Sequence, residues 1–401
     1  MGLTLPSFKE ISLSTAQIKK AVLPNEVTID LNQHQGIPAI SIVSAGDQVL
    51  TGSKIAYSSG ELSCNYHSSI SGKVKKVTSK SITIESDHKD EWDPKISEQK
   101  SWKFFSSSEI QNALIEAGVL DSLKPHLPIQ LFFGKPNTNE TLVIDACESE
   151  SFLTADYILM LCHAGEIAQG VELLLKATGV KRAVIVTEDD KREPAEVLLS
   201  KIRGLHLEFI EVKILKRQYP QKFKTSSPKL GLSTAHAAYE AVRFKKPQIE
   251  QVVTVSGHCV VEPKNIWCRI GTSVEEVFDL CKGLLREPDR VVVGGPMTGT
   301  SIAKLDFSIQ KGTKALLALA PEYLNEAREE SCIRCGFCAD VCPEQLLPES
   351  LMRFVRKKQK KHLVQYRLDQ CTECGNCTYV CPSKIRLSGI LREGKEMLVK
   401  S

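Results

Sequence analysis

Eight of the fourteen cysteines lie in the last seventy residues, as two copies of one pattern. The copies are Cys332-x2-Cys335-x2-Cys338-x3-Cys342-Pro343 and Cys371-x2-Cys374-x2-Cys377-x3-Cys381-Pro382. In each copy a glycine stands between the second and third cysteines, where the chain must turn tightly, and a proline ends the run by fixing φ. The C-terminal region must therefore form a small unit arranged around eight thiols.

This spacing is typical of bacterial proteins that hold two [4Fe–4S] clusters. Each loop supplies three thiolates to one cluster, and the fourth comes from the other loop. The predicted ligand sets are Cys332, Cys335, Cys338 and Cys381 for cluster 1, and Cys371, Cys374, Cys377 and Cys342 for cluster 2. Structural zinc is the alternative, but it closes with four ligands per ion and fits this triplet-plus-one arrangement less well. Disulfides would require an oxidising compartment.

Length and charge limit the remaining possibilities. A chain of 401 residues is expected to form several domains, and its net charge of +4 does not indicate a nucleic-acid partner. No secretory signal is visible at the N-terminus. The longest apolar runs, such as residues 315–320, are shorter than the ~18 residues that a membrane span requires. We therefore expect only peripheral membrane contact, directly or through partner subunits.

The sequence predicts a multidomain α+β and α/β fold. After an N-terminal segment, residues 1–27, short strands separated by turn residues predict a small β domain over residues 28–100. It resembles the barrel-sandwich hybrid of biotinyl and lipoyl carriers. The turn at residues 67–72 lacks the carrier lysine, which favours a scaffold role.

Further along, strands alternate with helices, which predicts a parallel sheet in a Rossmann-like α/β domain over residues 105–225. Its strands are expected at residues 142–144, 183–186 and 207–212. A small α+β unit is expected over residues 228–300, which resembles a β-grasp-like ligand-binding domain, and a helical two-cluster ferredoxin domain is expected over residues 320–401.

A basic run at residues 356–362 lies between the two cysteine motifs. It could attract an acidic electron carrier, because opposite fields accelerate encounter. It could equally be the solvated face of a connecting helix, and the shortness of the run favours this second interpretation.

Over nearly its whole length the chain resembles the C subunit of the Rnf ion-translocating oxidoreductase. The resembling segments include Gly46-Asp47, Glu148-Ser149-Glu150, Tyr219-Pro220-Gln221, residues 294–299 (GGPMTG) and the cysteine motifs. The resemblance implies a peripheral subunit on the cytoplasmic face of the bacterial plasma membrane. It also implies a translocase that couples electron flow between NADH and ferredoxin to ion movement. The implied partners are the other Rnf subunits and a ferredoxin-type electron carrier.

The chain departs from this family at the loop that admits flavin and NADH. The family has a glycine-rich loop of the type GxGGAGFPT, whereas residues 118–128 place Asp121, Leu123, Lys124 and His126 at the expected glycines. Side chains there would obstruct a phosphate or flavin, and a carboxylate would repel the phosphate. The segments at residues 219–225 and 231–234 have also lost the family pattern. We therefore expect two [4Fe–4S] clusters and neither FMN nor NADH.

The acidic pair Glu148 and Glu150 remains open to two interpretations. Binding loops lie at the strand ends of α/β sheets, so these residues are candidate cofactor-binding remnants of a flavin site. They are otherwise ordinary carboxylates of a loop. No residue is expected to act as an acid, base or nucleophile, because the redox chemistry belongs to the clusters.

Two other functions are compatible with the motifs. One is a flavin- and cobalamin-reducing protein of a bacterial microcompartment, which has a similar domain order but needs the same glycine-rich loop. The other is an assembly subunit that the clusters stabilise and that transfers no electrons.

Overall fold

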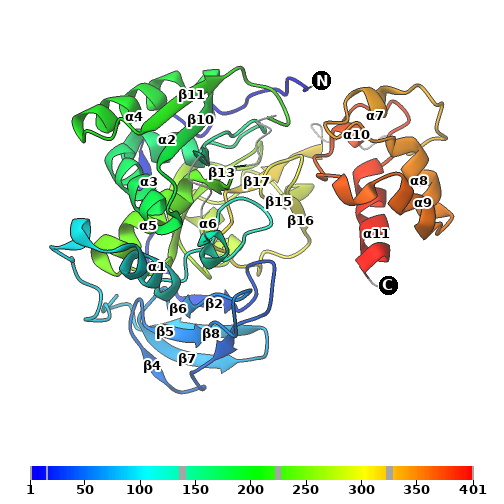
Figure 1. Ribbon diagram of the computed structural model, residues 1–401. Helices are drawn as coiled ribbons and strands as arrows, with labels where there is room; N and C mark the ends of the chain where they lie inside the picture. Colours follow the sequence, from blue (N-terminus) through cyan, green and yellow to red (C-terminus); the bar gives the residue numbers. More distant parts are fainter. Residues whose placement is uncertain (1, 15–16, 135–140, 222–226, 322–327, 400–401) are drawn as a thin grey trace.

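The computed structural model describes residues 2–14, 17–134, 141–221, 227–321 and 328–399. The protein combines antiparallel, parallel and mixed sheets with helices, as expected of a multidomain α/β chain. In Figure 1 the small β unit lies at the bottom, the helix-flanked sheets lie above it, and the C-terminal helices α7–α11 form a separate lobe.

The small β unit consists of two antiparallel sheets. One has the order β2-β8-β7-β4 and the other β3-β5-β6. The strands are β2 (Glu26–Asp30), β3 (Ile40–Ser41), β4 (Gln48–Val49), β5 (Lys54–Tyr57), β6 (Tyr66–His67), β7 (Gly72–Val77) and β8 (Ser81–Ser86). Val27 and Ile29 of β2 face Ile84 and Ile82 of β8, and all four are buried, because alternate side chains of a strand share one face. Gly72 has φ +153°, and a Cβ there would lie 1.9 Å from the carbonyl oxygen of Glu85.

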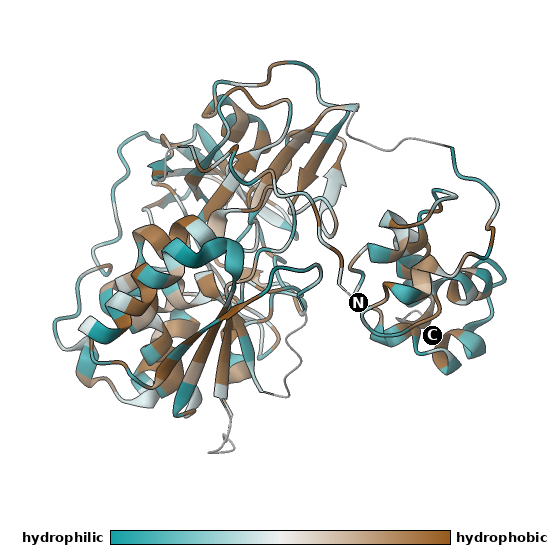
Figure 2. Ribbon diagram, turned by 90° about the horizontal axis from the view of Figure 1, so that it is seen from above, coloured by the Kyte–Doolittle hydropathy of each residue, from teal (hydrophilic) through white to brown (hydrophobic). Residues whose placement is uncertain are grey.

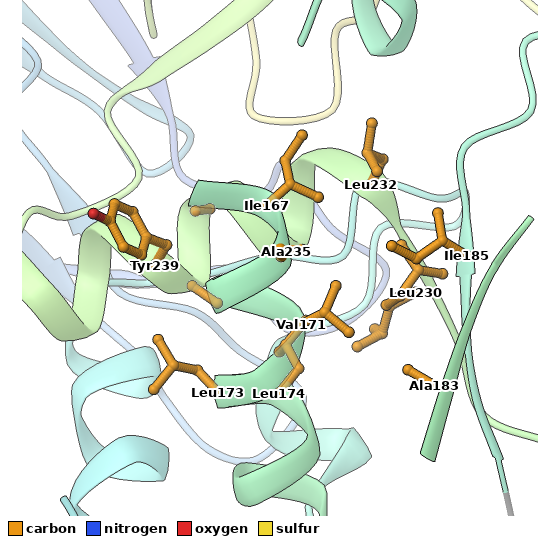
Figure 3. Packing of buried hydrophobic residues seen from close by; sticks show 14 of the residues in the cluster. Ile167, Val171, Leu173, Leu174, Ala183, Ile185, Leu230, Leu232, Ala235 and Tyr239 are labelled. Carbon is orange, nitrogen blue, oxygen red and sulfur yellow. The ribbon is translucent and has the colours of Figure 1, made fainter. Parts of the chain in front are cut away.

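The second unit is a parallel sheet in the order β11-β10-β9-β12, with a hydrophobic core between the sheet and its helices. The strands are β9 (Thr141–Asp145), β10 (Arg182–Glu188), β11 (Ile210–Leu215) and β12 (Lys229–Gly231). The helices are α1 (Ser107–Glu116), α2 (Ala155–Cys162), α3 (Ala164–Thr178), α4 (Arg192–Gly204) and α5 (Leu232–Phe244). Figure 3 shows Ile167, Val171 and Leu174 of α3 directed toward Ile185 and Leu230 of the sheet.

Two details of this unit differ from the sequence-based expectation. The strand expected at residues 207–212 lies at Ile210–Leu215, because Leu207 belongs to the turn that closes α4 and donates its N–H to Ile202. The sheet also takes its fourth strand, β12, and its last helix, α5, from beyond residue 225, where the domain was expected to end.

The third unit is a six-stranded sheet in the order β1-β14-β13-β17-β15-β16. Its strands are β1 (Ile18–Lys20), β13 (Glu250–Ser256), β14 (Lys264–Arg269), β15 (Arg290–Val293), β16 (Thr300–Ile302) and β17 (Ala315–Leu319), and α6 (Val274–Asp279) lies among them. The N-terminal segment supplies the edge strand β1, and the apolar run after residue 314 supplies the buried strand β17. Both pairings join segments that are far apart in the sequence.

The C-terminal lobe is helical and stands apart from the rest in Figure 2. Its helices are α7 (Phe337–Asp340), α8 (Pro348–Arg356), α9 (Lys360–Gln365), α10 (Asn376–Tyr379) and α11 (Leu387–Val399). Leu351, Val355, Leu363, Leu368 and Leu391 are buried together in its core.

In the described part of the chain no single helix has the length and apolar character of a membrane span. The bent pair α2 and α3, which meet at 98°, passes that test together by length and composition only.

Candidate iron–sulfur site

The two cysteine loops have the same backbone conformation. Gly336 and Gly375 stand before α7 and α10 with φ of 85° and 80°, in the left-handed region that favours glycine. Arg334 and Glu373 occupy equivalent positions with φ of 56° and 55°. The repeat seen in the sequence is therefore also a structural repeat.

The thiols of the predicted cluster 2 set lie around one pocket. Its lining includes Cys371, Cys374 and Cys377 from the second loop and Cys342 from the first. The amide of Leu346 donates to the sulfur of Cys342 over 3.3 Å. Four thiols from two loops fit a [4Fe–4S] cluster, because thiolate is the ligand that such clusters require.

The cluster 1 set is more open. Cys332 and Cys335 are exposed, and Cys338 is half-buried. Two hydrogen bonds join the segment just before Cys332 to the segment just after Cys381. The N–H of Glu330 donates to the carbonyl oxygen of Ser383 over 2.9 Å, and Oγ of Ser383 donates to the carbonyl oxygen of Ser331 over 3.0 Å. Among the residues that the structure describes, no three His, Cys, Asp or Glu side chains are grouped closely enough to hold a single metal ion.

Two segments of the main body support the second loop. Tyr219 Oη donates to the carbonyl of Cys374 over 2.6 Å. A Cβ on Gly375 would lie 3.0 Å from the carbonyl oxygen of Met297, so the 294–299 loop touches this turn. Sequence reasoning assigned no role to Tyr219 or Met297. The sequence does mark these two residues, because both lie in segments that carry the family resemblance.

Glu150 links the parallel-sheet unit to this supporting loop. Its carboxylate accepts the N–H groups of Met297 (2.7 Å) and Thr298 (3.2 Å). A Cβ on Gly295 would lie 2.1 Å from the same carboxylate, so the backbone approaches closely here. Glu150 therefore holds the loop that rests on the second cysteine loop.

Glu148 occupies the N-terminal end of α2. Its carboxylate accepts the N–H groups of Asp156 (2.7 Å) and Tyr157 (3.0 Å) and lies 2.9 Å from the ammonium of Lys191. Burial raises the pKa of Glu148, but the positive charges of Lys191, Lys9 and Lys314 outweigh burial and hold the pKa below its usual value. The carboxylate is thus ionised where an external anion would bind.

Asp121 occupies the N-terminal end of α5 in the same way. Its carboxylate accepts the N–H of Gly231 (2.8 Å), the hydroxyl of Thr234 (3.1 Å) and the N–H of Leu123 (3.3 Å). Burial raises the pKa of Asp121 to about 6. The neighbouring Ser122 N–H also donates to Thr234, so the 118–128 loop lies on the start of α5.

These two helix ends flank β9 and β12, where the strand order of the parallel sheet reverses. Open α/β sheets bind ligands at such a point, and helix N-termini there bind phosphate. In this protein a carboxyl group of the chain itself accepts N–H groups at each of the two helix ends, Glu148 at α2 and Asp121 at α5. The segment at residues 219–225 also departs from the family pattern, and its residues 222–225 lie outside the described residues.

Two cysteine loops on a helical lobe, attached to β and α/β domains, define a multidomain iron–sulfur protein. Four family models match the chain: the RnfC barrel sandwich hybrid domain (residues 1–90), the Nuo51 FMN-binding domain (128–226), the SLBB domain (252–301) and the 4Fe-4S dicluster domain (331–385).

Relatives match over most of the chain. The C subunit of the proton-translocating ferredoxin:NAD(+) oxidoreductase complex of Clostridium ljungdahlii is 32% identical, with 83% of this chain and 79% of that protein covered. The C subunit of an ion-translocating oxidoreductase complex of Rhodobacter capsulatus is 32% identical over 84% of this chain and 71% of that protein. The corresponding protein of the Na(+)-translocating ferredoxin:NAD(+) oxidoreductase complex of Acetobacterium woodii is 28% identical over 88% and 86%. The chain belongs to the RnfC family, the C subunits of ion-translocating oxidoreductase complexes.

Proposed function

We propose that this chain relays electrons through two [4Fe–4S] clusters as a subunit of an Rnf-type membrane complex that couples electron flow between NADH and ferredoxin to ion movement. The observation that carries the proposal is the pocket lined by Cys371, Cys374, Cys377 and Cys342, which draws thiols from both motifs. Family membership supports the same function, because the relatives named above are subunits of such complexes.

The proposed ligands are Cys332, Cys335, Cys338 and Cys381 for cluster 1, and Cys371, Cys374, Cys377 and Cys342 for cluster 2. When bound, each cluster exchanges one electron at a time. The polypeptide holds the thiols in place, buries the second loop under Tyr219 and Met297, and donates the Leu346 N–H to a ligand sulfur. Hydrogen bonds to sulfur and burial are the means by which a protein sets the potential of a cluster.

We also propose the fold of each domain, the domain bounds, the location of the chain and its partners. The parallel sheet is Rossmann-like and the six-stranded sheet is β-grasp-like. The first and last domains are residues 28–100 and 320–401. The second, expected over residues 105–225, extends through strand β12 and helix α5. The third, expected over residues 228–300, begins after α5 and includes strands β1 and β17 from outside those bounds. The chain acts at the cytoplasmic face of the membrane as a peripheral subunit, with other Rnf subunits and a ferredoxin-type carrier as partners.

We also propose that the chain itself binds neither FMN nor NADH. Asp121 and Glu148 occupy the two helix ends that would otherwise hold a phosphate. The match to the FMN-binding domain begins at residue 128, after most of the altered loop. Glu148 and Glu150 are then structural residues that cap α2 and hold the 294–299 loop.

The test is to purify the protein without oxygen and to measure its flavin content and its response to reductants. The expected protein contains no flavin, its clusters are bleached by dithionite, and NADH alone leaves them oxidised. A stoichiometric amount of FMN, or bleaching by NADH within seconds, would contradict the proposed absence of a flavin site. It would favour the FMN-binding role that the family match to residues 128–226 suggests.

A further inference from the structure

The two cysteine loops have the same backbone but opposite surroundings. Gly375 and Asn376 of the second loop are buried, with Asn376 0% exposed. Gly336 and Phe337 stand at the same positions of the first loop, where Phe337 is 53% exposed. A Cβ on Gly336 would meet no atom within 4 Å, whereas one on Gly375 would touch Met297.

At one pair of equivalent positions the polarity is the reverse of what burial would suggest, because the exposed residue is Phe337 and the buried residue is Asn376, whereas Ile333 and its equivalent Thr372 are both exposed. The exposed first loop carries Ile333 and Phe337 where the second loop has Thr372 and Asn376. Ile333 is 67% exposed, and nearby Leu347 is 49% exposed. Single exposed apolar residues are common, but a group of them beside a redox site indicates a surface that another molecule covers.

This surface is also basic. A hollow beside Cys338 is lined by Arg334, Leu347 and Arg353. The basic run at residues 356–362 lies close to the first loop. Its first residue, Arg356, forms an ion pair of 2.6 Å with Glu329, which stands three residues before Cys332. Residues 357, 358, 360 and 361 are exposed lysines, and of the nearby carboxylates Glu349 and Glu329 are already paired with Arg353 and Arg356. Glu330, Asp340 and Glu344 lie in the same segment, so basic side chains outnumber carboxylates by seven (residues 334, 353, 356, 357, 358, 360 and 361) to five (residues 329, 330, 340, 344 and 349), and the segment has a net positive charge.

We propose that the first-loop face, defined by Ile333, Arg334, Phe337, Leu347 and Arg353, is the docking site of an acidic electron-carrier protein. The partner would have a redox centre near its surface, ringed by carboxylates that meet the arginines and the lysines of the basic run. Its apolar centre would cover Ile333 and Phe337. Interfaces of this kind have an apolar centre and a charged rim that speeds encounter.

The inference rests on the proposed function, because it assigns an order to the two clusters. The second loop is covered by Tyr219 and the 294–299 loop, so a cluster held by this loop would face the body of the chain. Cluster 1 faces the exterior. In the transfer one electron leaves the reduced carrier and one enters cluster 1, and no bond forms or breaks.

The test uses the holoprotein, a strongly acidic bacterial two-cluster ferredoxin as the probe, and two variants. Phe337→Asn gives the first loop the residue of the second, and Arg334→Glu reverses a charge at the hollow. Lys80→Glu, an exposed charge in the turn between β7 and β8, is the matched control. The rate of cluster bleaching by reduced ferredoxin is followed by stopped flow, and binding of the ferredoxin by calorimetry, at low and high salt.

The expected result is a fall of about tenfold or more in rate and affinity for Arg334→Glu at low salt, which high salt diminishes, because steering by charge accelerates association by ~10–10³. Phe337→Asn should weaken binding at both salt concentrations. Lys80→Glu should change neither quantity. Equal rates and affinities for wild type and both first-loop variants would overturn the inference.

Two further readouts separate this inference from the proposed function. Iron content and bleaching by dithionite should be the same in wild type, Phe337→Asn, Arg334→Glu and Lys80→Glu, which shows that the clusters are intact. Absence of clusters in the wild type would contradict the proposed function instead. The Cys342→Ala protein, from which cluster 2 should be lost, should still show bleaching by reduced ferredoxin, and the absence of any bleaching there would refute the assigned order.

Discussion

The buried carboxyl group of Asp121, at the start of α5, should make the free energy of unfolding depend on pH. It is 4% exposed, and burial raises its pKa to about 6 from an ordinary value of 3.8. A folded-state pKa above the unfolded one means that the fold prefers the protonated carboxyl. The stabilisation is therefore fully present below pH 3.8 and is lost as the pH rises through about 6.

The size of the effect follows from the shift. A difference of about two pKa units corresponds to about 3 kcal/mol, of which roughly 1.3 kcal/mol is lost between about pH 5 and pH 7. Asp121→Asn removes the ionisation while its amide oxygen still accepts from the Gly231 N–H and the Thr234 hydroxyl. Relative to wild type, the variant should gain roughly 1.3 kcal/mol of unfolding free energy over this interval.

The assay is urea unfolding of the oxygen-free holoprotein at several pH values between about 5 and 7, followed by fluorescence. Trp102 reports on the right region, because it is buried in the core of the parallel-sheet unit with its ring centroid 6.0 Å from that of Tyr239. Asp289→Asn, an exposed carboxyl, is the control and should follow the wild type. Parallel pH profiles for wild type and Asp121→Asn would refute the account of this helix end.

Three further predictions concern the ligands and the core. Cys342→Ala should remove the cluster held mainly by the second loop and halve the iron content to about four atoms per chain, and spectra showing loss of cluster 1 instead would contradict the crossed ligation. Lys191→Met removes the ion-pair partner of the buried Glu148 carboxylate, so the free energy of unfolding should fall by about 3–5 kcal/mol in urea titrations, whereas Lys181→Met on the surface should have almost no effect. Gly170→Ala places a Cβ 1.8 Å from the Ala235 carbonyl oxygen. This overpacking should lower the free energy of unfolding by about 1–3 kcal/mol, and with it the unfolding temperature. Gly165→Ala in the same helix meets nothing within 4 Å and should instead stabilise by up to about 1 kcal/mol, and equal shifts for the two alanines would refute this reasoning.

Sequence patterns predicted the features that depend on local chemistry. The cysteine spacing indicated a repeated loop, and Gly336 and Gly375 have the positive φ that such a turn requires. Gly179 ends α3 with φ 74°, in the left-handed region where glycine is the usual residue after a helix. These features follow from neighbouring residues, so no knowledge of distant contacts was needed.

The features that the sequence did not reveal depend on distant segments. Strand β1 pairs with β14, in which Asn265 is the partner of Ile18, and nothing near residues 18–20 indicates so distant a partner. The strand expected at residues 207–212 was misplaced by three residues because Leu207 is apolar but belongs to a turn. Glu148 and Glu150 were open to two interpretations, since their partners Lys191 and Met297 are far away in the sequence. The opposite exposure of the two cysteine loops is likewise a property of tertiary structure.

The most direct test of the central claim is the iron and acid-labile sulfide content of protein prepared without oxygen. Eight cysteine ligands in two sets of four predict about eight irons and eight sulfides per chain, with dithionite bleaching the visible absorbance. Two zinc ions per chain and no labile sulfide would contradict the electron-relay function, because zinc does not undergo redox changes.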